Sequence, residues 1–159
     1  MSDQDTNTET RQQRLNRNWA DILQELRVIQ AGSQIITGFL LAAAFQPRFA
    51  DLDDIGRAIY FSLLAVAIAT TIVGLTPVLL HRWLFGIGAK GPLVTLGGRL
   101  CAAALVGVGV TLAGIVLLIV DLVAGLVMGI VAAVLTLVVI AALWLLLPTA
   151  VQRGLGRDR

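Results

Sequence analysis

The stretch "LCAAALVGVGVTLAGIVLLIVDLVAGLVMGIVAAVLTLVVIAALWLLL", residues 100–147, decides the fold of this chain. Its only ionisable side chains are those of Cys101 and Asp121. A helix needs about 20 apolar residues to cross a bilayer, and this run has roughly twice that length. It must therefore cross the membrane twice, as a helical hairpin.

The whole chain has the composition of a membrane protein. Of its 159 residues, 57% are hydrophobic and 14% are charged, and the mean hydropathy is +0.86. Soluble domains have about 45–50% apolar and about 25% charged residues. We predict an all-α integral membrane four-helix bundle, with spans at about 26–45, 57–80, 94–119 and 124–147.

The region before the first span divides into a polar tail and an amphipathic helix. We expect residues 1–17 to be a disordered cytoplasmic tail, residues 18–153 to form the four-span membrane domain, and residues 154–159 to form a second cytoplasmic tail. Asn18 resembles a helix N-cap, and apolar residues follow it at helical spacing. These residues are Trp19, Ile22, Leu23, Leu26 and Ile29. The pattern predicts an amphipathic helix in the headgroup layer that is continuous with span 1.

The distribution of positive charge predicts the orientation of the spans. Ten of the twelve Lys and Arg residues lie on the side of the membrane that holds the two termini and the 81–99 loop. The other two, Arg48 and Arg57, lie in the 46–57 loop on the opposite side. Cytoplasmic loops carry the excess of Lys and Arg. We therefore expect a multi-pass membrane protein with both termini in the cytoplasm.

Polar side chains collect on one face of span 1. Advancing ~100° per residue places the polar side chains between positions 27 and 37 within an arc of about 120° on the helix. Glu25 precedes them on the cytoplasmic side. The face consists of Glu25, Arg27, Gln30, Ser33, Gln34 and Thr37. At ~1.5 Å per residue, Gln34 lies about 16 Å from Phe45, close to the membrane centre. An unpaired amide in hydrocarbon costs several kcal/mol, so this face is either an interface with protein or the lining of a hydrated pathway.

Two further features of spans 3 and 4 are candidate functional positions. Asp121 lies either in the turn between these spans or within the membrane, where it would be a possible ion or proton site. Small residues recur at four-residue spacing, which lets helices approach closely in lipid. The glycines expected to serve helix packing are Gly98, Gly107, Gly109, Gly125 and Gly129.

The sequence contains no recognisable catalytic or metal-binding pattern. Cys101 is the single cysteine, which excludes an intrachain disulfide and a thiolate metal cluster. His81 is the single histidine and has no cysteine near it, so an interfacial role is favoured over metal ligation. No catalytic triad or metalloprotease motif is present. We expect a protein that is not an enzyme and that has no cofactor, no metal and no nucleic-acid partner.

Four segments together resemble a known bacterial family. They are "LQELRVIQAGSQ" (23–34), "FQPRFADLDD" (45–54), "HRWLF" (81–85) and the closing Pro148–Arg153. The chain is similar over about residues 14–153 to small four-span membrane proteins that are catalogued as a domain of unknown function. The resemblance implies four spans, and implies that the face bearing Glu25, Arg27, Gln30 and Gln34 matters to the family.

These observations favour a protein that acts by association within the membrane. The leading hypothesis is a non-enzymatic multi-pass protein that forms a homo-oligomer, or docks in a larger membrane complex, through the polar face of span 1. The alternative is an oligomeric cation or proton channel, or a small transporter, lined by span 1. The expected partners are the lipid bilayer and either copies of the same chain or other membrane proteins.

Overall fold

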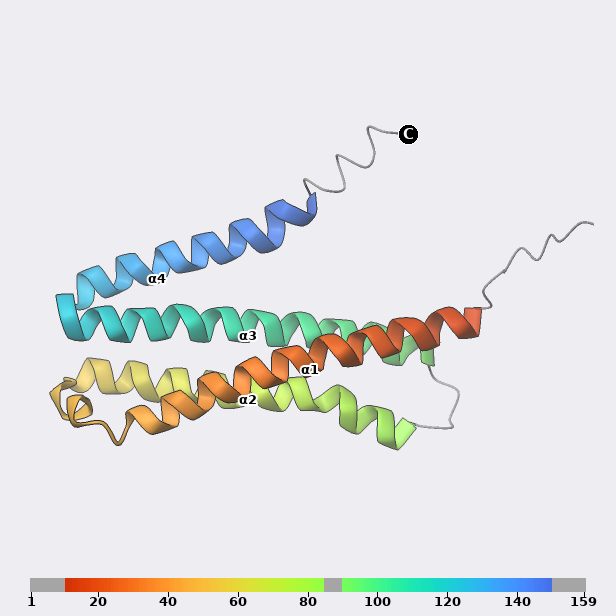
Figure 1. Ribbon diagram of the computed structural model, residues 1–159, viewed down its shortest axis with the longest axis horizontal. Coiled ribbons are helices and arrows are strands. Elements are labelled where there is room, and N and C mark those ends of the chain that lie inside the picture. Colours follow the sequence, from red (N-terminus) through yellow and green to blue (C-terminus); the bar gives the residue numbers. More distant parts are fainter. Residues whose placement is uncertain (1–10, 85–89, 150–159) are drawn as a thin grey trace, which may run out of the picture.

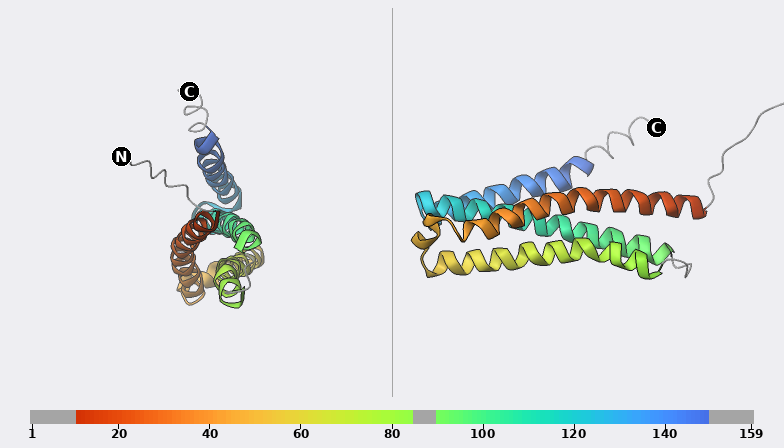
Figure 2. Two further views of the ribbon diagram at one scale, coloured as in Figure 1. Left: turned by 90° about the vertical axis from the view of Figure 1, so that its right-hand side faces the viewer. Right: turned by 60° about the horizontal axis from the view of Figure 1, so that its bottom comes forward.

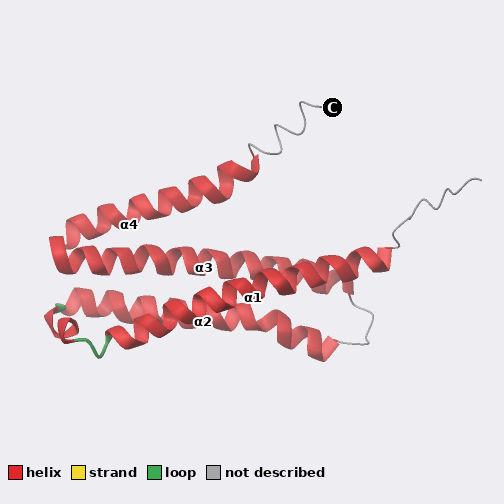
Figure 3. Cartoon of the chain, viewed as in Figure 1, coloured by secondary structure: helices red, strands yellow, loops and turns green. Residues whose placement is uncertain are grey.

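The computed structural model describes residues 11–84 and 90–149, and these residues are almost entirely helical (Figure 3). The long helices are α1 (Arg11–Ala43), α2 (Asp54–Leu84), α3 (Lys90–Ala124) and α4 (Leu126–Ala141). A short 3₁₀ helix, η1 (Pro47–Asp51), joins α1 to α2, and a π-helical segment, η2 (Ala142–Leu146), continues α4. Four helices of the described chain are long and apolar enough to cross a membrane. The all-α, four-span fold class is therefore confirmed.

Helices α1, α2 and α3 form the body of the bundle, and α4 packs against α3. Figure 1 shows α4 leaving the α3–α4 turn beside α3 and diverging from it toward the C-terminus. The end-on view in Figure 2 shows α4 projecting away from the other three helices. Two of the connections, η1 and the α3–α4 turn, lie at one end of the bundle, here called the η1 end.

Glycines in α3 set the close packing of α2 on α3. A Cβ atom placed on Gly107 would overlap the hydroxyl of Thr70, and one placed on Gly114 would lie 2.5 Å from Leu63 Cδ1. These two glycines are seven residues apart, so they lie on one face of α3. The missing side chains let Thr70 and Leu63 of α2 sit directly on the α3 backbone.

The α3–α4 hairpin depends on two other glycines. Gly125, between the helices, has φ of +87°, a conformation that glycine adopts without steric cost. One turn later, a Cβ on Gly129 would lie 2.8 Å from the carbonyl oxygen of Leu117 in α3. Farther from the turn, the larger side chains of Ile140 and Trp144 reach Gly109 of α3. The contact is therefore closest at Gly129, and larger side chains bridge the helices where they diverge.

The N-terminal part of α1 differs from the sequence prediction. Residues 11–17, predicted to belong to a disordered tail, form the first turns of α1, and Asn18 lies inside the helix and is not its cap. Residues 1–10 and 150–159 lie outside the described chain. With no Gly or Pro before Gly32, the helix extends without interruption.

The apolar stripe of this segment packs against protein, not against lipid headgroups. Trp19 is buried, and its ring lies over Gly97 of α3, where a Cβ would be 2.8 Å from Trp19 Cζ3. Ile22 contacts the same glycine, and Leu26 is fully buried. The missing side chain of Gly97 thus provides the space into which the indole ring fits.

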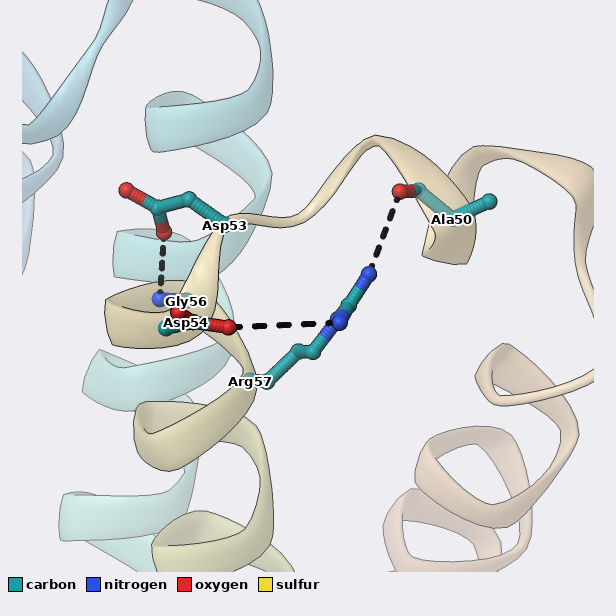
Figure 4. A network of polar contacts seen from close by, with 5 residues as sticks. All are labelled: Ala50, Asp53, Asp54, Gly56 and Arg57. Atoms are coloured by element: carbon teal, nitrogen blue, oxygen red, sulfur yellow. Dashed lines mark hydrogen bonds and ion pairs between the residues drawn. The ribbon is translucent and has the colours of Figure 1, made fainter.

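The start of α2 at the η1 end is fixed by a side-chain cap (Figure 4). The Asp53 carboxylate accepts a hydrogen bond of 2.7 Å from the Gly56 backbone N–H, which is an N-cap interaction. Arg57 forms a 4.0 Å ion pair with Asp54 and donates to the Ala50 carbonyl at 3.5 Å. These contacts hold the η1 connection against the first turn of α2.

Candidate functional site

Three of the predicted polar residues of α1 are turned toward α2 or onto α1 itself. Gln30 Nε2 donates a 3.0 Å hydrogen bond to the Gly74 carbonyl of α2. The Ser33 and Thr71 hydroxyls are hydrogen-bonded at 3.1 Å, and Thr37 donates to the Ser33 carbonyl at 2.8 Å. These groups are satisfied within the chain, and the bonds of Gln30 and Ser33 stabilise the α1–α2 contact.

The Gln30 contact lies beside a proline in α2. Pro77 is buried within α2, and a proline inside a helix lacks the N–H of an intrahelical hydrogen bond and opens the preceding turn. Side chains of neighbouring helices commonly bond to the backbone groups of such a turn in membrane proteins. The Gln30 side chain lies against this turn, since a Cβ on Gly74 would be in ordinary van der Waals contact with Gln30 Cγ, at 3.6 Å.

Glu25 connects α1 to α3 at the end of the bundle opposite η1. The buried Cys101 thiol of α3 donates to Glu25 Oε2 at 3.6 Å. Glu25 directly precedes the buried Leu26, so a polar and an apolar contact of α1 are adjacent. Glu25 therefore belongs with Gln30 and Ser33 among the residues of α1 that bond to neighbouring helices.

Arg27 and Gln34 lie beside these residues on α1, at exposed positions. Within the described residues, neither side chain has a hydrogen bond or ion pair with the rest of the protomer. Gln34 is the deeper of the two, about 16 Å from Phe45 along the helix. The predicted polar face is thus divided into an inward part and an outward part, although Gln30 and Gln34 are only ~40° apart on the helix.

Small residues share the outward part of α1 with Gln34. A Cβ on Gly38 would meet no atom within 4 Å, and Ala31 and Ala42 are also exposed. On a helical wheel these positions lie within an arc of about 100° around Gln34. We call this surface the outer stripe, and define it as Arg27, Ala31, Gln34, Gly38, Leu41 and Ala42.

Asp121 lies in the last turn of α3, four residues before Gly125. Its carbonyl accepts the Gly125 N–H at 2.9 Å, and its backbone N is 3.2 Å from where a Gly129 Cβ would be. The structure therefore places Asp121 beside the hairpin turn at the η1 end. Among the described residues, no group of three His, Cys, Asp or Glu side chains could hold a metal ion.

Three of the five glycines predicted to serve helix packing lie at contacts between helices, and two do not. Gly107 meets α2, and Gly109 and Gly129 lie between α3 and α4. Gly98 has no atom within 4 Å of its Cβ position, and Gly125 forms the turn itself. The His81 side chain and residues 85–89 lie outside what the structure describes.

An apolar groove at the η1 end was not predicted from the sequence. It has a volume of about 310 Å³ and lies between α1, η1 and the last turns of α3. The residues that line it come from separate segments and share no motif, so only their placement in space brings them together. A second cavity of about 540 Å³ lies between α2 and α3 on the same half of the bundle. Neither cavity is lined by Gln30 or Gln34.

Comparison with known proteins identifies the family of the chain. A family model described as a family of unknown function (DUF6328) matches residues 8–148. The chain belongs to this family. The DUF6328 match covers the four apolar helices together with η1, which confirms the resemblance seen in the sequence. No curated protein and no solved structure matches the chain.

Proposed function

We propose that this DUF6328 protein is a non-enzymatic membrane protein that self-associates through the outer stripe of α1. The observation that carries the proposal is Gln34, an exposed carboxamide within an apolar helix that has no partner among the described residues of its own protomer. Leaving such a group against hydrocarbon costs several kcal/mol, so a partner at this position is strongly favoured.

A second copy of the same chain supplies suitable chemistry for that position. A carboxamide has both donor and acceptor atoms, so two Gln34 side chains related by a twofold axis along the membrane normal can bond to each other. Gly38 and Ala42 are four residues apart and exposed, which permits close approach of two α1 helices next to the amide pair. Arg27 lies about 10 Å from Gln34 toward the N-terminus, where its long side chain can reach lipid phosphates.

The inward residues favour assembly over conduction through a single protomer. Gln30 and Ser33 are occupied by hydrogen bonds to α2, so they do not present free polar groups to an axial path. Both described cavities lie away from Gln30 and Gln34. The charge distribution of the sequence further supports cytoplasmic termini, and the resemblance to a bacterial family supports a location in the bacterial cytoplasmic membrane.

Cysteine crosslinking in intact membranes tests this proposal. In a Cys101→Ala background, which removes the native thiol, a Gln34→Cys variant is treated with a short thiol crosslinker. We expect a covalent dimer. The matched control is Ala65→Cys, an exposed residue of α2 at a similar distance from the η1 end, which should give little dimer.

A second variant separates assembly from folding. Gln34→Leu removes the amide and should weaken association by roughly 3- to 30-fold, because an interhelical hydrogen bond in lipid contributes about 0.6–2 kcal/mol. The monomer should remain folded, since Gln34 has no intraprotomer partner among the described residues. Equal crosslinking from positions 34 and 65, together with unchanged association of Gln34→Leu, would refute self-association through this stripe.

A further inference from the structure

The groove at the η1 end extends from the apolar part of the bundle to its polar edge. Its floor is formed by three buried side chains, Leu40 of α1, Tyr60 of α2 and Leu118 of α3. The Tyr60 hydroxyl donates to the Leu40 carbonyl at 2.7 Å, so this residue offers an aromatic ring and no free polar group to the groove. Phe39 and Ile119 are 72% and 58% exposed and line the same groove, which therefore opens sideways toward the bilayer.

The polar end of the groove carries a pair of opposite charges. Arg48 lines the groove and forms a 3.6 Å ion pair with Asp51. Their side chains are 78% and 57% exposed, and such an exposed ion pair contributes little to stability. The other charges of this connection are used locally, because Asp53 caps α2 and Arg57 pairs with Asp54.

We propose that this groove binds one phospholipid with a primary ammonium in its headgroup, such as a phosphatidylethanolamine. One acyl chain lies in the apolar groove, the Arg48 guanidinium binds the phosphate, and the Asp51 carboxylate accepts hydrogen bonds from the ammonium. The volume of about 310 Å³ is at the lower end of the roughly 300–1,000 Å³ of ligand pockets, so the groove holds part of one acyl chain and the rest of that chain lies in the bilayer.

Charge complementarity decides the headgroup. Arg48 and Asp51 are adjacent and of opposite sign, and a phosphoethanolamine head carries the two complementary charges side by side. Phosphatidylglycerol would satisfy Arg48 but brings no positive charge to Asp51, only the neutral hydroxyls of its glycerol. A quaternary choline has no N–H to donate to Asp51. The same two residues therefore disfavour phosphatidylglycerol and phosphatidylcholine.

Native mass spectrometry of the full chain, released from detergent micelles, tests the headgroup. Dioleoyl-phosphatidylethanolamine, -phosphatidylglycerol and -phosphatidylcholine are added in equal amounts. We expect retention of one phosphatidylethanolamine per chain in preference to the other two lipids. Asp51→Asn should lower that preference by roughly three- to tenfold, the effect of losing one charged contact. Asp54→Asn is the matched control, because it removes an acid of the same connection that pairs with Arg57 and not with the groove-lining Arg48.

The apolar part of the site is tested by filling it. Ala43→Phe places a ring in the groove and should reduce retention of all three lipids, whereas Ala69→Phe, at an exposed position of α2, should not. Circular dichroism establishes that both variants are folded. Equal retention by the two Phe variants would overturn the groove as the site, and equal effects of Asp51→Asn and Asp54→Asn would overturn the headgroup assignment.

Photolabelling of the wild-type chain gives a readout that needs no variant. A phosphatidylethanolamine with a diazirine on its acyl chain is incorporated into proteoliposomes and activated by light. We expect labelling concentrated on residues 115–122 of α3, which border the groove. Labelling spread evenly over the exposed faces of α2 and α4 would contradict a defined site.

Discussion

Replacing Gly107 with alanine should destabilise the bundle, because this glycine is the closest described approach of α3 to a side chain of α2. A methyl group at position 107 would overlap the Thr70 hydroxyl and would lie 3.0 Å from both Thr70 Cβ and Thr70 Cγ2. Thr70 cannot move away without cost, since it is buried on a helix and its hydroxyl donates to the Val66 carbonyl at 2.8 Å. Overpacking a close helix contact in this way costs about 1–3 kcal/mol.

The assay is reversible unfolding in mixed micelles of mild detergent and SDS, followed by circular dichroism. Gly98→Ala is the internal control, because it makes the same change in the same helix where no atom lies within 4 Å. There the added methyl should be neutral or stabilising by up to about 1 kcal/mol. Thr70→Ala combined with Gly107→Ala should recover part of the loss, with a coupling energy of about 0.5–2 kcal/mol. If Gly107→Ala is as stable as Gly98→Ala, the tight α2–α3 contact is not a feature of the folded protein.

Three further substitutions test other contacts by the same unfolding assay. Gln30→Leu should lower the free energy of unfolding by about 0.6–2 kcal/mol, because its hydrogen bond to α2 is lost. Gln34→Leu, assayed as a monomer, should leave that free energy unchanged, and equal effects of the two substitutions would contradict the division of the polar face. Gly125→Ala should cost about 1–2 kcal/mol because φ is +87° there, and no loss would mean that the hairpin turns differently. Asp53→Ala should lower the free energy of unfolding by about 0.5–2 kcal/mol, because the helix cap is lost, while Asp53→Asn should retain most of that stability. Identical losses for the two variants would argue against the cap.

Sequence reasoning predicted the class and number of the helices well, because apolar length is a strong signal in membrane proteins. The run that contains only Cys101 and Asp121 as ionisable residues could fold only as a membrane hairpin, and α3 and α4 form that hairpin. The cap of α2 also follows a common sequence pattern, since Asp53 directly precedes the helix and Asp is a frequent N-cap residue.

The N-terminal part of α1 and the roles of the individual glycines were less predictable. The polarity of residues 11–17 indicated a tail, but helix propagation from a long stable helix requires no apolar residues of its own. The apolar stripe that contains Trp19 could pack on lipid headgroups or on another helix. In the structure it packs on α3, where Gly97 lacks a side chain and leaves space for the indole ring. Small residues throughout α3 and α4 likewise do not reveal which glycine serves a contact and which serves the turn.

The division of the polar face of α1 could not be read from the sequence for a physical reason. Helical spacing gives only an angle, and the ~40° between Gln30 and Gln34 is smaller than the arc that a neighbouring helix covers. What separates the two amides is an acceptor on α2, the Gly74 carbonyl in the turn beside Pro77, which reaches Gln30 and not Gln34. The folded protomer thus satisfies one amide and leaves an equivalent amide exposed one turn away. Since both amides face the same cost in hydrocarbon, the proposed self-association would supply to Gln34 the kind of contact that folding supplies to Gln30.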